Sequence, residues 1–383
     1  MLLVAAVSGC QTPTRSARTE QSPQPAREPG YTTEQRYTVA SEHQTWTLGD
    51  HTYDVSVVRP SGSGSFPLIV YLPGLGEPPI AGTAWRTAWA QAGYVVVAIQ
   101  FPGDGEGVLS SPKARSGDFV ELAKQRYSPA ALAERLAVLQ LVFEEVQRRR
   151  ASGALAGVDD AHIALAGFDL GAQTAMAAAG EGDAGRAHFD LPSSVKCIVA
   201  FSPYADFSGT AFEQRYAAIE LPVMSVTSTE DADPFGVVSS PALRRAPFEN
   251  MPAGHKYLLS LGGAPHALIA GSETPSIYAQ SGKDNSSGQS DNASRDGSSS
   301  RHKGGMRGSQ GSHRGGARDS DSGASASGPR PVSAAAWSAE LGRAETVTTA
   351  YLDAFVKNDS VASEWLRKDA RRWLADSADL RVK

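Results

Sequence analysis

The spacing of apolar positions changes along the chain and divides it into predicted strands and helices. Residues 45–48 and 53–58 alternate apolar and polar side chains around Gly49-Asp50, a pattern that predicts a β-hairpin. Further along, short continuous apolar runs are typical of strands buried on both faces of a parallel sheet. These runs are residues 67–72, 94–99, 162–166, 195–201, 222–227 and 256–261.

Helical spacing separates several of these runs. Ser128-Pro129 supplies a capping hydroxyl and a proline at the first helical position. It precedes apolar residues at helical intervals, namely Leu132, Leu136, Leu139, Phe143 and Val146. Trp85 and Trp89 lie on another predicted helix, and residues 347–355 on a terminal one. Alternating strands and helices predict the α/β class, with a mostly parallel central sheet and helices on both faces.

The composition indicates one large folded domain and two segments with too few apolar residues to form a hydrophobic core. Residues 11–35 are rich in Pro, Thr, Ser, Gln and Arg, and half of residues 281–330 are Ser or Gly. Neither segment buries enough apolar surface to offset its chain entropy. We expect a disordered tether over 11–35, the α/β domain over 36–280, a disordered insertion over 281–330, and C-terminal helices over 331–383 that complete the same domain.

Residues 1–10 form a short signal-like segment that ends at Cys10. This apolar run closes in small residues before the cysteine, and it resembles the lipobox of bacterial lipoproteins. The resemblance implies lipidation of Cys10 and a location in the bacterial cell envelope, periplasm-facing or at the outer membrane, because two hydrophobic chains give stable attachment. The run is short and has no basic leader, so we expect the natural start to lie further upstream.

Charge and cysteine usage narrow the classes of partner. The net charge is −5 and no basic face is evident, so we expect no nucleic-acid partner. No run reaches the roughly 18 apolar residues of a spanning helix, which leaves the lipid as the expected contact with a membrane. Cys10 and Cys197 lie in unrelated contexts, and Cys-x-x-Cys and His-Glu-x-x-His are absent. We expect no metal and no cofactor, and a small molecule as substrate.

The strongest chemical motif follows the strand at 162–166. Gly167-Phe168-Asp169-Leu170-Gly171 joins that strand to an Ala-rich helix. Small residues at both ends of such a turn allow a sharp bend that lifts the middle side chain above the sheet, as in a nucleophile elbow. The lifted residue in this chain is Asp169.

Two partners for Asp169 follow in order. Asp231 comes after the strand at 222–227, and His266 comes after the strand at 256–261. Asp231 is the preferred acid, because Asp233 precedes a proline and is expected to start a turn, and Glu230 is the third choice. Nucleophile, acid, histidine is the order of an α/β-hydrolase triad.

A glycine turn after the first parallel strand supplies the other half of the predicted site. Pro73-Gly74-Leu75-Gly76 can direct the Leu75 backbone N–H toward the point where the Leu170 N–H also converges. Two backbone donors at that point would form an oxyanion hole.

These motifs give residues 45–268 a resemblance to the α/β-hydrolases, most closely to bacterial dienelactone-hydrolase-like and platelet-activating-factor-acetylhydrolase-like proteins. The resemblance implies an α/β-hydrolase fold. Members of that branch hydrolyse small esters with a serine at the position of Asp169. Only residues 202–221 are available between the sixth and seventh strands, so we expect no large cap domain, and residues 104–127 are the candidate for a smaller lid.

An aspartate at the elbow changes the expected chemistry. Its attack on an ordinary ester would give an anhydride, whereas displacement at saturated carbon gives an alkyl ester that water then cleaves, as in the haloalkane dehalogenases and epoxide hydrolases of this fold. We expect a hydrolase of a small ester-like or alkylating substrate that uses Asp169, His266 and Asp231.

Two alternatives stay open at the level of sequence. In the first, an ion pair between Asp169 and His266 locks an inactive pseudo-hydrolase that serves as an envelope-tethered binding protein. In the second, Ser202, at the end of the next strand, is a displaced nucleophile.

Overall fold

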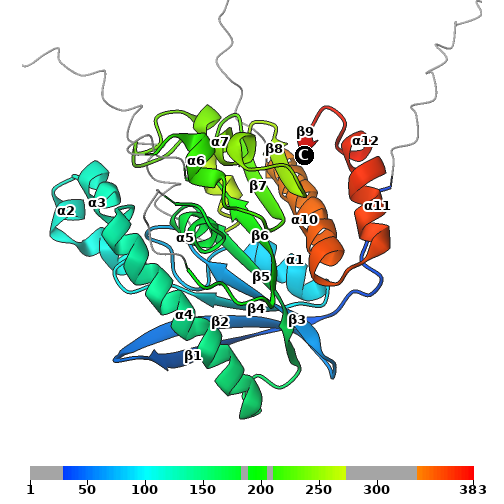
Figure 1. Cartoon of the computed structure of the whole chain (residues 1–383), viewed down its shortest axis with the longest axis horizontal. Helices are drawn as coiled ribbons and strands as arrows, with labels where there is room; N and C mark the ends of the chain where they lie inside the picture. The colour runs from blue at the N-terminus through cyan, green and yellow to red at the C-terminus, as the bar shows by residue number, and fades with distance from the viewer. Residues whose placement is uncertain (1–28, 183–188, 205–209, 273–333) are drawn as a thin grey trace, which may run out of the picture.

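The computed structural model describes residues 29–182, 189–204, 210–272 and 334–383, and the side chains from residue 337 in the last range. The strands of these residues form one nine-stranded sheet in the order β1-β2-β4-β3-β5-β6-β7-β8-β9 (Figure 1). Their bounds are β1 Val39–Leu48, β2 His51–Pro60, β3 Phe66–Leu72, β4 Val95–Ile99, β5 Val158–Phe168, β6 Val195–Phe201, β7 Val223–Ser228, β8 Lys256–Leu261 and β9 Ala378–Val382. The predicted hairpin and the six apolar runs are all strands.

Most of the sheet is parallel. β4, β3, β5, β6, β7 and β8 pair in parallel, whereas β1 pairs antiparallel with β2, β2 with β4, and β8 with β9. The carboxyl ends of the parallel strands therefore meet at one edge of the sheet, where ligand sites of α/β proteins form.

Helices cover both faces of the sheet (Figure 1). α4 (Pro129–Ala151) and α5 (Leu170–Ala178) pack on one face, and α1 (Thr83–Gln91) and α10 (Ala334–Val356) on the other. β3 shows why its run is continuously apolar, because Leu68 and Val70 point into the α4 side and Ile69 and Tyr71 into the α1 side. The class is α/β with a mostly parallel sheet, as the sequence predicts.

Shorter helices occupy the connections. They are η1 Glu106–Ser110, α2 Pro112–Arg115, α3 Phe119–Arg126, α6 Phe212–Tyr216, η2 Pro241–Arg245, α7 Ala246–Asn250, α8 His266–Ile269, α11 Ser360–Lys368 and α12 Ala370–Leu374. The candidate lid over 104–127 therefore consists of η1, α2 and α3. Between β6 and β7 the described residues contain the single short helix α6.

The N-terminal boundary of the packed domain differs from the prediction. The tether was expected to continue to residue 35, but Tyr31 donates a hydrogen bond to Asp353 Oδ2 at 2.7 Å, and the Pro29 carbonyl accepts one from Trp365. Tyr31 also packs against the Trp365 ring. These aromatic contacts with the C-terminal helices offset the entropy of ordering residues 29–35.

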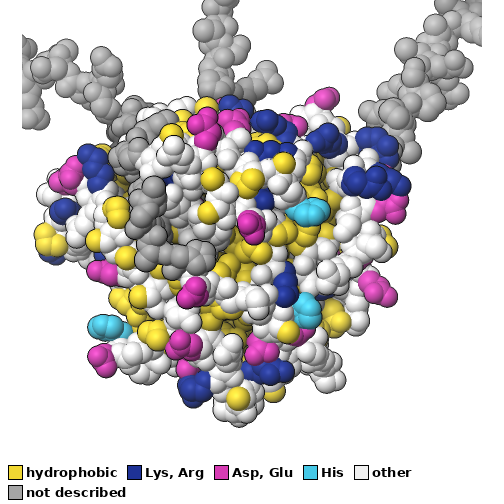
Figure 2. Space-filling model, viewed as in Figure 1, with side chains coloured by type: hydrophobic (Ala, Val, Ile, Leu, Met, Phe, Trp, Pro, Cys, Tyr) yellow, Lys and Arg dark blue, Asp and Glu magenta, His cyan; other side chains and the backbone are white. Residues whose placement is uncertain are grey.

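Several predictions fall outside the described residues. They are the signal-like segment with Cys10, the tether up to residue 28, and the insertion over 281–330. No helix in the described part of the chain is long and apolar enough to cross a membrane. On the face shown in Figure 2, acidic and basic side chains are scattered among uncharged ones.

Candidate active site

A sharp bend at Asp169 separates β5 from α5. Asp169 has φ 51° and ψ −107°, a strained conformation for a residue with a side chain. The flanking glycines are required by close packing. A Cβ on Gly167 would lie 2.4 Å from the Gly171 carbonyl carbon, and a Cβ on Gly171 would lie 1.9 Å from the Leu72 oxygen. The Gly-x-Asp-x-Gly motif therefore encodes a strand-to-helix turn pressed against the end of β3.

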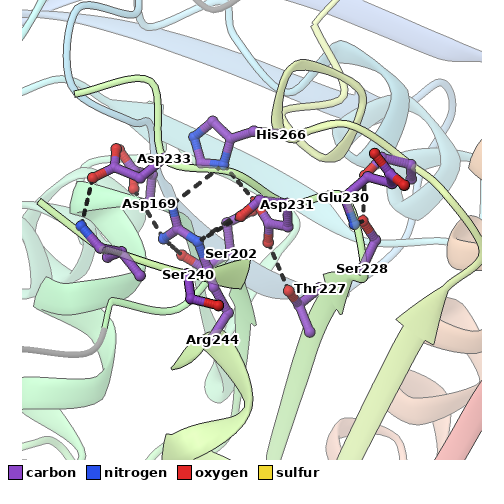
Figure 3. A network of polar contacts seen from close by, with 12 residues as sticks. Asp169, Ser202, Thr227, Ser228, Glu230, Asp231, Asp233, Ser240, Arg244 and His266 are labelled. Carbon is purple, nitrogen blue, oxygen red and sulfur yellow. Dashed lines mark hydrogen bonds and ion pairs between the residues drawn. The ribbon is translucent and has the colours of Figure 1, made fainter. Parts of the chain in front are cut away.

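His266 and Asp231 lie together at the same edge of the sheet (Figure 3). His266 begins α8 after β8, and its Nδ1 lies 2.6 Å from Oδ1 of Asp231, which follows β7. The Asp231 carboxylate also accepts hydrogen bonds from Ser202 Oγ at 3.0 Å and from Thr227 Oγ1 at 2.7 Å. A carboxylate held by two hydroxyls fixes the orientation of the imidazole, and it selects the tautomer with the proton on Nδ1 and the basic lone pair on Nε2.

The other two candidate acids have different partners. Asp233 accepts hydrogen bonds from the backbone N–H groups of Phe235, Val237 and Val238, so it shapes a turn. The backbone N–H of Glu230 donates to Ser228 Oγ. Of the three acids considered from sequence, the structure brings Asp231 to His266.

Ser202 is in direct contact with the predicted acid. It follows β6 with φ 46°, and its hydroxyl donates to Asp231 Oδ1. A nucleophilic serine needs its hydroxyl directed at a base that removes the proton, here an imidazole nitrogen. The observed hydrogen bond therefore favours a supporting role for Ser202.

Arg244 is the first of two residues near this site that the sequence did not single out. It lies on η2 with 0% exposure, between the two aspartates. Its Nη1 is 3.4 Å from Asp169 Oδ1, its Nε is 3.5 Å from Asp231 Oδ1, and its Nη1 donates to the Ser202 carbonyl at 2.8 Å. Arg244 Nη2 is also 3.5 Å from His266 Nδ1. Ser240-Pro241 signals a helix start in the sequence, but no local pattern indicates that Arg244 points inward.

The two aspartates have opposite electrostatic environments. Burial raises the pKa of Asp169, and the nearby charges of His266 and Arg244 offset only part of that rise. Burial alone would raise the pKa of Asp231. Its pKa is nevertheless lowered below the usual value, because of the Arg244 charge, the contact with His266 and the hydrogen bond from Thr227. Neighbouring carboxyls whose environments shift their pKa values apart are typical of sites with a division of chemical roles.

Tyr127, at the end of the candidate lid, reaches the bend. Its side chain hydrogen-bonds Asp169 and its ring stacks on Tyr204 with centroids 4.5 Å apart. The Tyr127 carbonyl accepts from Gln173 Nε2 at 3.1 Å, and Gln173 in turn accepts from Arg135 at 2.6 Å. The segment over 104–127 is thus joined by hydrogen bonds to α5, the helix that begins at the bend.

The turn expected to supply an oxyanion donor follows β3 at the same edge. Leu75 is fully buried, and Leu170 begins α5 directly after Asp169. The neighbouring amides are tightly held, because Gly74 N–H donates to Glu77 Oε2 at 2.9 Å and Gly76 N–H donates to the Asp104 carbonyl at 2.6 Å. Glu77 therefore holds the shape of this turn.

Glu77 is a second residue that the sequence did not single out. Burial raises the pKa of its carboxyl from 4.5 to about 7, against hydrogen bonds from Gly74 and Ser272 that lower it, while the Asp169 charge adds to the rise. Because the folded state binds this proton more tightly than the unfolded chain does, the associated stability is fully present below pH 4.5 and is lost as pH rises through about 7.

We expect Glu77→Gln to be more stable than the wild type at pH 8, by about 3 kcal/mol, and nearly equal to it at pH 4.5 and below. The amide keeps the shape of the carboxyl and can still accept from Gly74. Urea unfolding across this pH range measures the difference. Glu106→Gln, at an exposed carboxyl, is the matched control and should leave the profile unchanged. A constant difference between Glu77→Gln and wild type at all pH values would contradict the assignment.

No cluster of three or more potential metal-ligating side chains occurs among the residues that the structure describes. No protein-family model matches the chain, and no curated protein sequence matches it.

Proposed function

We propose that this protein is an α/β-hydrolase-fold enzyme that hydrolyses a small ester-like or alkylating substrate with Asp169 as nucleophile. The observation that carries the proposal is the strained bend at Asp169, with the His266–Asp231 pair beside it. Strain of this kind persists where the surrounding structure requires it, and it is concentrated at functional sites. The positions after β5, β7 and β8 are also those of nucleophile, acid and histidine in the resemblance described above.

The first chemical step is a displacement at saturated carbon. A carboxylate oxygen of Asp169 attacks the carbon, and the bond to the leaving group breaks and transfers its electron pair to that group. The products are an alkyl ester of Asp169 and an anion. The Asp169 carboxylate is 1% exposed, and it needs no base for this step.

The second step is hydrolysis of that ester. Nε2 of His266 takes a proton from water, and the resulting hydroxide adds to the Asp169 carbonyl carbon. Asp231 holds the imidazole and stabilises its positive charge. The backbone N–H groups of Leu75 and Leu170 stabilise the oxyanion. The oxyanion then collapses, the bond to the alkyl oxygen breaks, and the proton held by His266 passes to that oxygen to give the alcohol. Asp169 is left as a carboxylic acid, which loses its proton to solvent and returns to the carboxylate.

Oxygen labelling tests the nucleophile. A single turnover of a short primary alkyl bromide in heavy-oxygen water, with enzyme in excess, should place the label in Asp169 and leave the alcohol unlabelled. Peptide mass spectrometry reads both products, and Asp233, a nearby carboxyl outside the proposed reaction, serves as the internal control. A labelled alcohol with an unlabelled Asp169 would show direct attack by water and overturn this mechanism.

One observation favours the second candidate function, a binding protein without turnover. Arg244 lies 3.4 Å from Asp169, and a carboxylate paired with a buried cation is a weaker nucleophile than a free one. In that case Asp169→Ser should create a serine beside His266 and give cleavage of short acyl esters, whereas the wild type would cleave neither these esters nor alkyl bromides.

We also propose attachment to the bacterial cell envelope through a lipid at Cys10. The lipobox-like run that ends at this cysteine supports the proposal. Mass spectrometry of the mature N-terminus tests it, and an unmodified chain that begins before Cys10 would be the contrary result.

A further inference from the structure

Arg244 is held in place by contacts that do not depend on Asp169. Nη1 donates to the Ser202 carbonyl at 2.8 Å, and Nε lies 3.5 Å from both the Asp231 carboxylate and the Asp231 carbonyl. The contact with Asp169, at 3.4 Å, is longer than the bond to Ser202. Figure 3 shows the guanidinium between the aspartates, below the imidazole. Loss of the Asp169 charge would therefore leave the guanidinium where it is.

Charge balance in this buried site changes during the proposed reaction. Before reaction, one guanidinium faces two carboxylates, Asp169 and Asp231. Formation of the alkyl ester removes the negative charge of Asp169 and at the same moment creates a new anion from the leaving group. Arg244 then keeps the Asp231 carboxylate but loses one of its two anionic partners, so its Nη1 is no longer paired with a carboxylate.

We infer that Arg244 is an anion-binding residue that exchanges the Asp169 carboxylate for the leaving group, so that the substrates are alkyl compounds whose leaving group departs as a small, weakly basic anion such as a halide. This inference rests on the proposed function. The exchange conserves charge, since one negative partner replaces another beside the same guanidinium. The connection between β6 and β7 is too short to form a cap domain that would donate hydrogen bonds to a departing anion. In this proposal, Arg244 supplies those hydrogen bonds instead.

The chemistry of arginine selects the leaving group. A guanidinium is permanently charged and donates hydrogen bonds without giving up a proton. It stabilises an anion that needs no proton, whereas a strongly basic alkoxide requires a proton donor. Arg244 therefore favours alkyl halides over ethers as substrates. It also favours substrates whose leaving group dissociates from the alkyl group as a free anion.

Bromide binding to an Asp169→Asn variant tests the inference without any turnover. The amide mimics the uncharged, alkylated state, so we expect D169N to bind bromide at least about tenfold more tightly than the wild type, in which Asp169 competes for Arg244. Titration followed by tryptophan fluorescence measures the affinity. Anomalous scattering from bromide-soaked crystals of D169N should place the ion within hydrogen-bond distance of Arg244 Nη1.

Two further variants complete the design. D169N/R244Q should lose the gain in affinity. Glu181→Gln is the matched control, because it neutralises the carboxylate of another buried pair, 2.7 Å from Arg215, and should leave bromide absent from Arg244. Equal affinity of D169N and wild type, or a bromide peak away from Arg244, would overturn the inference. The peak position decides the result even if the double variant fails to fold.

Failure of this inference and failure of the proposed function are distinguishable. Oxygen labelling reports whether Asp169 reacts, and it does not depend on where the anion goes. Bromide binding reports on Arg244 in a variant that cannot react. A labelled Asp169 together with no bromide at Arg244 would keep the nucleophile and remove the anion site.

Discussion

Replacing Arg244 with glutamine is expected to lower the free energy of unfolding by about 3–5 kcal/mol, the largest effect on stability that we predict. The substitution removes the cation from a site in which Asp169 and Asp231 are 1% and 0% exposed, and it leaves both carboxylates buried without that partner. Urea unfolding at pH 7, followed by circular dichroism, measures the change.

A second variant separates charge from packing. If the loss in R244Q comes from an uncompensated carboxylate, the double variant D169N/R244Q should regain part of the lost free energy of unfolding. The interaction energy from the double-mutant cycle should then exceed about 0.5 kcal/mol, the limit for independent sites. Arg148→Gln is the surface control. Arg148 pairs with Glu145 but is 64% exposed, so its loss should cost less than about 1 kcal/mol. An R244Q variant as stable as R148Q would contradict the role of Arg244 as the central counter-charge.

Replacing His266 with glutamine is expected to have the largest effect on turnover. The displacement step needs no base, so Asp169 should still be alkylated, whereas hydrolysis of the ester should slow by roughly 10²–10⁴-fold. Mass spectrometry of His266→Gln incubated with a short alkyl bromide should therefore show one stoichiometric adduct on the peptide that contains Asp169. Steady-state release of the alcohol measures the slowed step.

His162→Gln provides the control for this experiment. His162 also lies against a carboxylate, with Nδ1 2.7 Å from Asp159, but it is 41% exposed and outside the site. Its replacement should leave turnover unchanged and produce no adduct. Full turnover by His266→Gln, or a variant that neither turns over nor accumulates an adduct, would be incompatible with the proposed division of the reaction into two steps.

Much of the fold is determined by the sequence alone. The apolar runs predict the strands β3 to β8, because a strand buried on both faces requires apolar side chains at consecutive positions, and this signal is local. The bend at Asp169 is also local, since Gly167 and Gly171 are the residues that such close packing permits. The chain order then places Asp169, Asp231 and His266 at the same edge of a parallel sheet before any contact is known.

Contacts between distant segments were decided by the tertiary structure. β9 pairs with β8 across more than a hundred residues, and Tyr31 docks on Asp353 from the other end of the chain. β9 is a short edge strand and Tyr31 is a single aromatic residue in a polar segment, so neither shows a periodic pattern of apolar residues that would predict its contacts. The sequence therefore predicts terminal helices but not the strand that follows them, and it ends the tether a few residues too late.

The same distinction applies within the site. The sequence determines which backbone positions bring carboxylates and an imidazole to the sheet edge, since that follows from strand order. The tertiary structure alone decides that Arg244 points between Asp169 and Asp231 and that Glu77 is buried under the neighbouring turn. The direction of these side chains depends on how long connections pack on the sheet, and that packing is set by many weak contacts rather than by any residue pattern.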